Sequence, residues 1–131
     1  MPPFFKTSVL ICGNPSHADF PLRLEGIRAH NRWLADYCAG HPDRLFGLAM
    51  IPLQSIEVAV EELQFARKEL GLKAAFIRAN PVDHRYVHDE SNHAIWATAQ
   101  DLDMSMAIHV GGGVPGLGAD RYQSPGVAHV V

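Results

Sequence analysis

Short apolar runs alternate with longer amphipathic segments through most of this 131-residue chain. The apolar runs are rich in β-forming residues, and they predict strands at Ser8–Cys12, Leu45–Ile51, Ala74–Ile77 and Met104–Val110. The segments between them carry a helical repeat, and they predict helices over Phe20–Cys38, Ser55–Leu70 and Asn92–Leu102. Because helices and strands alternate strictly, we expect parallel strands joined by right-handed crossovers.

Local signals support these boundaries. Leu45–Ile51 is apolar throughout, which is typical of a strand that a parallel sheet buries on both faces. Ser55 and Ser91 are candidate N-caps for the second and third helices, and Gly71 is a candidate C-cap for the second. In the first helix, the 3.6-residue repeat predicts a buried stripe of Leu24, Ile27, Leu34 and Cys38.

Two α/β architectures fit this order of elements. One is an open, doubly wound sheet, and the other is part of a (β/α)₈ barrel. Both place their ligands at the carboxyl ends of the strands. The segments expected there are Cys12–Asn14, Pro52–Gln54, Arg78–Asn80 and His109–Gly113.

Composition limits the classes of function. Hydrophobic residues make up 47% of the chain and charged residues 19%, which predicts a single folded domain over residues 1–131. The net charge of −3 argues against nucleic-acid binding, which needs a basic surface. Cys12 and Cys38 form no C-x-x-C pair, so we expect neither a disulfide scaffold nor a cysteine zinc site. Without an apolar run of membrane length or the residue order of a signal peptide, the expectation is a cytoplasmic protein that does not enter membranes.

Two side chains at strand ends could carry chemistry. His109 ends an apolar strand and precedes three glycines, so its imidazole could point into the mouth of the sheet and bind zinc. A hydrogen-bonded histidine at the sheet rim is the alternative. Arg78 also ends a strand, where its guanidinium could hold a substrate carboxylate with two hydrogen bonds. A structural salt bridge is an equally good interpretation of Arg78.

Two further patterns are weaker. The segment Gly111–Gly116 contains G-x-G-x-x-G, but Pro115 disfavours the helix that a dinucleotide site requires directly after it. A nucleotide-binding, doubly wound domain is therefore the least favoured interpretation. His84, His88 and His93 lie in or next to a polar loop and share no helix face, so they are interpreted as solvated side chains.

Three runs of the chain resemble the amidohydrolase-related family, whose branches include aminocarboxymuconate-semialdehyde decarboxylase and related decarboxylases and hydrolases. These runs are Asn31–Gln54, Leu70–Val82 and His93–Gly113. Their most specific pieces are N-x-W-L-A-D-Y, H-P-D-R-L-F-G and A-I-H-V-G-G, and the resemblance covers residues 26–122.

The resemblance implies a (β/α)₈ barrel with a divalent metal, usually zinc, at the carboxyl ends of its strands. In that family a mid-barrel strand supplies a metal-binding histidine, and His109 stands at that position. Arg78 and Asn80 would then face the same mouth as substrate-binding residues. The resemblance assigns no catalytic residue.

The chain also departs from the family pattern. It contains no H-x-H pair, and the family's later acid/base histidine and the aspartate on a still later strand have no counterpart before Val131. His129 falls in the region after the His109 strand and is not assigned the acid/base role. About four consecutive βα units of a partial barrel are therefore expected.

The expected function is that of a metal-dependent hydrolase or decarboxylase acting on a small organic substrate, carboxylated or not, with weak metal binding and no activity in this chain alone. A non-catalytic or partner-dependent subunit is the alternative. The expected partners are the substrate and either further copies of the chain or the other half of the barrel.

Overall fold

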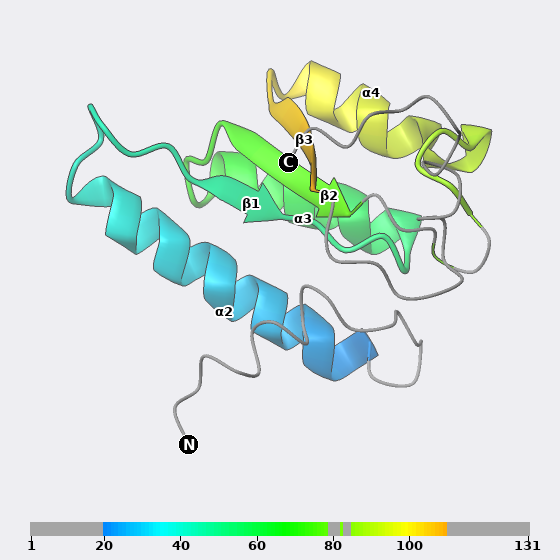
Figure 1. Ribbon diagram of the computed structural model, residues 1–131, viewed down its shortest axis with the longest axis horizontal. Helices are drawn as coiled ribbons and strands as arrows, with labels where there is room; N and C mark the ends of the chain where they lie inside the picture. The colour runs from blue at the N-terminus through cyan, green and yellow to red at the C-terminus, as the bar shows by residue number, and fades with distance from the viewer. Residues whose placement is uncertain (1–19, 79–81, 83–84, 110–131) are drawn as a thin grey trace, which may run out of the picture.

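The computed structural model describes residues 20–78, 82 and 85–109 (Figure 1). Its helices are α2 (Phe20–Ala39), α3 (Ile56–Lys68) and α4 (His93–Asp101), the last preceded by a 3₁₀ turn, η2 (Glu90–Asn92). Its strands are β1 (Leu48–Met50), β2 (Ala74–Arg78) and β3 (Ser105–His109). The predicted strand Ser8–Cys12 lies outside the described residues.

The three strands form a parallel sheet in the order β1-β2-β3, as the alternation of elements predicts. In its register, Phe76 of β2 lies between Met50 of β1 and Ala107 of β3. Spatial order follows chain order, without the reversal that marks the switch point of an open doubly wound sheet. This order is typical of consecutive units of a barrel.

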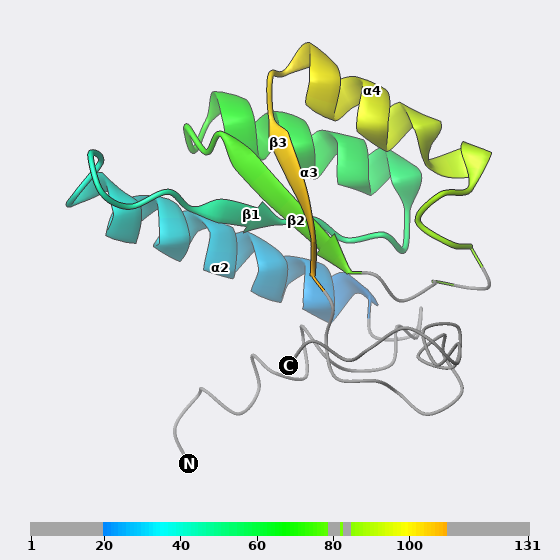
Figure 2. The same cartoon turned by 45° about the horizontal axis from the view of Figure 1, so that its top comes forward.

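The helices lie side by side on one side of the sheet. Figure 2 shows α3 and α4 together behind the strands, with α2 running beside β1. Side chains of α2 contact α3, because Arg28 pairs with Glu62 and the guanidinium of Arg32 lies 5.4 Å from the centre of the Phe65 ring. A doubly wound sheet would place helices on both faces, so the arrangement of these helices again favours a barrel.

The strand β1 is shorter than the predicted run Leu45–Ile51 and begins three residues later, at Leu48. At its start, the Leu45 amide bonds the His41 carbonyl at 2.9 Å and continues the turn that ends α2. At its end, the pairing runs one residue past Met50, because Ile51 donates a backbone hydrogen bond to Phe76 at 3.1 Å, and Pro52 follows directly.

The predicted N-cap of α3 is confirmed, whereas its C-cap is Glu69 rather than the predicted Gly71. The Ser55 hydroxyl accepts a hydrogen bond from the Val58 amide at 3.2 Å, and Gly71 adopts a positive φ of 68° just after the helix. The prediction for α4 is wrong in one detail. Ser91 lies inside η2, and Asn92 precedes α4, with its side-chain amide donating to the Tyr86 carbonyl at 2.8 Å.

The hydrophobic core lies between the sheet and the helices α3 and α4. Leu63, Ile77 and Ile95 are its largest fully buried apolar side chains, one each from α3, β2 and α4. Complete burial of a side chain of this size stabilises a fold by about 1.5–3 kcal/mol. The apolar faces of the three elements therefore hold the described sheet and helices together.

The buried stripe of α2 differs from the prediction. Ile27 is buried as predicted, but the other buried residues of this helix are Arg23 and Asn31. The Asn31 side chain is 1% exposed and bonds the backbone of Met50 twice. A polar residue is buried here because both of its polar atoms meet backbone partners.

An ion pair joins α2 to α3. Arg28 Nε donates to Glu62 Oε1 at 2.6 Å, and Arg28 Nη1 donates to Glu25 at 3.1 Å. The hydrogen bond to Glu62 is the main cause that raises the pKa of Arg28.

Among the described residues, no helix combines the length and the apolar character that a membrane crossing requires.

Candidate active site at the carboxyl ends of the strands

Alternation along the strands gives the sheet two chemically different faces. On one face lie the buried core residues Ala49, Ile51, Ala75 and Ile77, with the partly buried Met106 packed against the core. The opposite face faces away from α3 and α4 and carries Leu48, Met50, Ala74, Phe76, Arg78, Ser105, Ala107 and His109. This second set corresponds to the side chains that line the interior of a (β/α)₈ barrel.

Arg78 and His109 are neighbours at the carboxyl edge of this inner face. They are register partners on adjacent strands, and both are the last residues of their strands. The Arg78 side chain is half-buried and His109 is exposed. The two predicted residues are therefore brought together at the mouth, whereas the third, Asn80, lies outside the described residues.

Phe76 forms the apolar floor next to these two polar groups. Its ring centre lies 5.8 Å from that of His109, and the ring planes are tilted by 49°. It sits two residues before Arg78 on the same strand and therefore on the same face. A cation, an imidazole and an aromatic ring thus share one corner of the inner face.

Long-range hydrogen bonds from two side chains hold the end of β1 and the loop that follows it at this edge. The Asn31 side chain fixes the backbone of Met50, the last residue of β1. Downstream, the Arg85 guanidinium donates to the carbonyl of Leu53. The rim beside the site is therefore fixed by side chains from α2 and from the segment after β2.

The described residues do not supply a complete metal site. Within residues 20–78, 82 and 85–109, no three His, Cys, Asp or Glu side chains come together in a way that could hold a metal ion. His88 and His93 are exposed, and the His88 ring stacks on Tyr86 with centres 5.6 Å apart. A catalytic zinc needs three protein ligands. Among the histidines that the structure describes, His109 is therefore the one candidate metal ligand that stands at the mouth.

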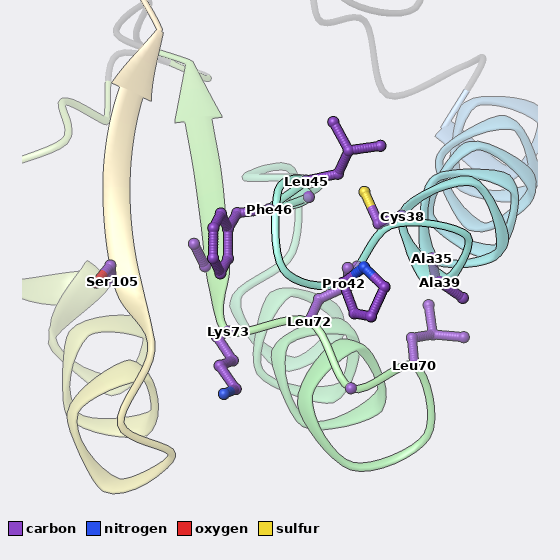
Figure 3. Close-up of a pocket in the computed structure, with 13 residues that line it drawn as sticks. Ala35, Cys38, Ala39, Pro42, Leu45, Phe46, Leu70, Leu72, Lys73 and Ser105 are labelled. Carbon is purple, nitrogen blue, oxygen red and sulfur yellow. The ribbon is translucent and has the colours of Figure 1, made fainter.

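A separate pocket lies at the other end of the sheet. It has a volume of about 430 Å³ and is lined by apolar side chains that include Cys38, Leu45, Leu70 and Leu72 (Figure 3). Ser105, at the start of β3, also lines it, so it opens at the amino ends of the strands. Barrel enzymes carry their chemistry at the carboxyl ends, so this pocket is distinct from the candidate site.

The sequence analysis missed two residues of this region. Phe76 could have been found, because strand alternation puts residue i−2 on the same face as Arg78. Asn31 carried no such signal, since its partner Met50 is 19 residues away and contributes only backbone atoms. The roles of Arg78 and Asn80 in substrate binding and of His109 in metal binding stay predictions.

Comparison with known proteins identifies the family. A family model described as "Amidohydrolase" matches residues 16–131. The chain is 33% identical over 97 residues to a gamma-resorcylate decarboxylase of Polaromonas sp. (strain JS666 / ATCC BAA-500), covering 70% of this chain and 30% of that protein. It is 32% identical over 115 residues to a gamma-resorcylate decarboxylase of Rhodococcus jostii (strain RHA1), covering 79% of this chain and 35% of that protein.

Solved structures agree with these relatives. The crystal structure of 2,6-dihydroxybenzoate decarboxylase complexed with 2,6-dihydroxybenzoate matches with a TM-score of 0.67 and 28% identity, over 78% of this chain and 33% of that one. A 2,6-dihydroxybenzoate decarboxylase from Rhizobium matches with a TM-score of 0.65 and 29% identity, over 72% of this chain and 31% of that one. The chain spans about a third of the length of these relatives. The sheet and its one-sided helix layer are thus part of a (β/α)₈ barrel, and the chain belongs to the amidohydrolase family.

Proposed function

We propose that this chain carries part of the active site of a metal-dependent decarboxylase that acts on an aromatic carboxylate. The observation that supports this most directly is the corner formed by Phe76, Arg78 and His109. The similar proteins of known activity are decarboxylases of dihydroxybenzoates. An arginine beside an aromatic ring suits a ligand that combines a carboxylate with a flat apolar body.

Each residue of the corner has a distinct role in this proposal. The Arg78 guanidinium pairs with the substrate carboxylate and orients it. The Phe76 ring packs against the ring of the substrate and excludes water from it. In decarboxylation the bond between the ring carbon and the carboxyl carbon breaks, carbon dioxide leaves, and a proton takes its place on the ring.

The described residues supply only part of the ligand set that the proposed metal needs. The family generally uses a divalent metal, and zinc is the proposed ion. The donor set that the structure describes at the mouth, His109 alone, does not fit a complete zinc centre. We therefore propose His109 as one ligand of the metal and no more.

A second candidate function follows from the same donor set. With one proposed ligand at the described mouth, the chain could act as a partner-dependent subunit that completes its site with residues from elsewhere. A hydrolase of the same family is a third candidate, and it differs in that its substrate needs no carboxylate. The cytoplasmic location stays a prediction.

Ligand binding by the 131-residue chain tests the proposal. Nuclear magnetic resonance of the labelled chain should show saturable shifts at Phe76 and His109 when 2,6-dihydroxybenzoate is added. The decarboxylated compound, 1,3-dihydroxybenzene, should bind more weakly because Arg78 gains no ion pair from it. Arg78→Ala should weaken 2,6-dihydroxybenzoate binding by about tenfold to a hundredfold, since a charged hydrogen bond contributes about 1.5–3 kcal/mol.

Arg44→Ala is the matched control, because Arg44 is exposed and lies before β1 rather than at the mouth. It should leave binding unchanged. Equal binding of the two aromatic compounds would favour the hydrolase. Shifts that do not saturate, or that Arg78→Ala leaves unchanged, would reject this corner as a carboxylate site.

A further inference from the structure

Arg85 joins two loops at the rim of the mouth. It lies in the segment after β2, and its guanidinium Nη2 donates a hydrogen bond to the carbonyl of Leu53, in the loop that follows β1. The two residues are 32 positions apart in the sequence. This side chain therefore ties the segment after β2 to the loop after β1.

Both ends of this contact are anchored in the core. The Arg85 amide donates to the Val82 carbonyl at 2.9 Å, and the Val82 amide donates back to the Arg85 carbonyl at 3.1 Å. Val82 and Leu53 are both buried, and both belong to the hydrophobic core. Because the backbone of Arg85 and the acceptor that it reaches are both fixed, the contact can hold the two loops in one arrangement.

The loop after β1 begins directly beside Arg78. The Ile51 amide, one residue past the end of β1, donates to the Phe76 carbonyl at 3.1 Å. When this register is continued, Pro52 comes level with Arg78 on the inner face of the sheet. Leu53 follows at once, so the position of this loop decides what flanks the Arg78 side chain on the β1 side.

The Arg85 guanidinium has partners in both of the elements that it joins. Besides its bond to Leu53, its charge acts on Glu57 in the first turn of α3. The pKa of Glu57 is lowered chiefly by the hydrogen bond from its own backbone amide, next by the Ser55 hydroxyl, and further by the charge of Arg85. An arginine with an acceptor and an opposite charge inside the chain is suited to position the rim.

We propose that Arg85 is a positioning residue of the candidate site: by holding Leu53, it keeps the loop after β1 against Arg78, so that the Arg78 guanidinium faces the substrate carboxylate in one orientation. A binding group that is not held in place loses affinity even when the group itself remains. This role rests on the proposed function, because it acts through the ion pair between Arg78 and the carboxylate. It needs no other part of a barrel, since Leu53 and Arg85 both belong to the described residues.

Ligand binding by Arg85 variants of the 131-residue chain tests this role. Arg85→Ala should weaken 2,6-dihydroxybenzoate binding by about threefold to thirtyfold, since neighbouring groups in one network couple by about this much. Binding of 1,3-dihydroxybenzene, which has no carboxylate, should change by less than about twofold. A merely structural role would weaken the binding of both compounds alike.

Two further substitutions at the same position separate the hydrogen bond from packing. Arg85→Met removes the donor but keeps a long aliphatic stem, so it should weaken binding of the acid as much as Arg85→Ala does. It decides the question if the alanine variant does not fold. Arg85→Lys should restore part of the affinity, because a lysine ammonium can also donate to the Leu53 carbonyl.

A double-mutant cycle distinguishes positioning from direct contact with the substrate. If Arg85 acts through Arg78, Arg85→Ala should cause no further loss of binding in a chain that already carries Arg78→Ala. If Arg85 contacts the carboxylate itself, its replacement would weaken binding in both backgrounds. That result would overturn the proposal.

Arg67→Ala is the matched control. Arg67 makes the same kind of contact, since its Nε donates to the Leu102 carbonyl at 3.0 Å, and like Arg85 it is half-buried. Arg67 lies in the last turn of α3 and Leu102 directly after α4, at the ends of the helices away from the mouth. This substitution should leave the binding of both aromatic compounds unchanged.

The tether between the loops has a readout that needs no ligand. Backbone order parameters from nuclear magnetic resonance relaxation of the free chain should fall at Leu53 and Gln54 in Arg85→Ala. They should stay at the wild-type level in Arg67→Ala. Far-ultraviolet circular dichroism should show that both variants are folded.

Failure of the wild-type chain to bind the acid would overturn the proposed function and this role together. With normal binding in the wild type, a folded Arg85→Met chain that binds the acid just as tightly would overturn this role alone. Equal losses of binding for the acid and for the neutral compound would do the same.

Discussion

Both polar atoms of the Asn31 side chain are bonded to the backbone of a single residue, Met50. Asn31 Nδ2 donates to the Met50 carbonyl at 3.0 Å, and the Met50 amide donates to Asn31 Oδ1 at 2.8 Å. The side chain of a helix thus replaces a neighbouring strand at the edge of β1. This bond pair joins α2 to the sheet at the end nearest the candidate site.

Replacing this side chain should destabilise the fold. Asn31→Ala removes both partners of the Met50 backbone in a buried place, and each unsatisfied group costs about 1–3 kcal/mol. Urea unfolding should show a loss of at least about 2 kcal/mol in the free energy of unfolding. Gln64→Ala removes an exposed amide from α3 and should change stability by less than about 0.5 kcal/mol. A similar loss in both variants would show that the Asn31 bonds contribute little.

Stability should depend on pH through His30. Burial lowers the pKa of His30 in the folded chain, so the unfolded chain binds the proton more readily. The stabilisation is complete above the ordinary value near 6.5 and is lost as the pH falls below it. The melting temperature measured from pH 8 to pH 5 should fall less steeply in His30→Gln than in the wild type. Parallel curves for the two proteins would rule out this contribution.

The two glycines that follow helices should respond differently to alanine. Gly71 has a φ of 68°, which costs other residues roughly 1–2 kcal/mol, although nothing lies within 4 Å of an added Cβ. Gly71→Ala should therefore lower the free energy of unfolding by about 1 kcal/mol. At Gly40 an added Cβ meets the Tyr37 carbonyl oxygen at an ordinary 3.6 Å, so Gly40→Ala should be neutral or stabilising. Chemical denaturation of both variants distinguishes a backbone effect from a packing effect.

The 131-residue chain by itself should bind zinc weakly and show no turnover. One proposed ligand at the described mouth cannot replace three. Elemental analysis after dialysis should find much less than one zinc per chain, and His109→Ala should lower the residual binding further. Tight, stoichiometric zinc that His109→Ala leaves in place would show that other residues hold the metal.

Periodicity in the sequence was sufficient to predict much of the described fold. The strands β2 and β3 and the helices α2 and α3 begin and end within a few residues of their predicted bounds, because apolar runs and caps are local signals. The buried stripe of α2 was only partly predictable. The hydrophobic repeat predicted that Leu24 and Cys38 are buried, whereas the fold buries Arg23 and Asn31. The partner of Asn31 is the backbone of a residue far away in the sequence, which a local pattern does not reveal.

The sequence predicted only those residues of the candidate site that lie at the ends of strands. Parallel strands end at one edge, so Arg78 and His109 were expected to meet, and the register pairs them. Phe76 could have been placed in the site only by also using the alternation of side chains along β2. Further ligands for the proposed metal could not be derived in this way, because the described residues bring no three candidate ligands together.

The Asn31 side chain also affects which edge of the sheet can pair with a further strand. On β1, both backbone groups of Met50 are already occupied, so a strand added there could not pair at the carboxyl end. On β3, the Ser105 amide bonds the Lys73 carbonyl of the segment leading into β2, so the backbone groups of Met106 and Ile108 point the other way. Within the described residues, β3 therefore offers a full-length template for a new parallel strand, whereas β1 offers a shortened one. Assembly of a larger barrel around this unit would thus extend most readily from β3.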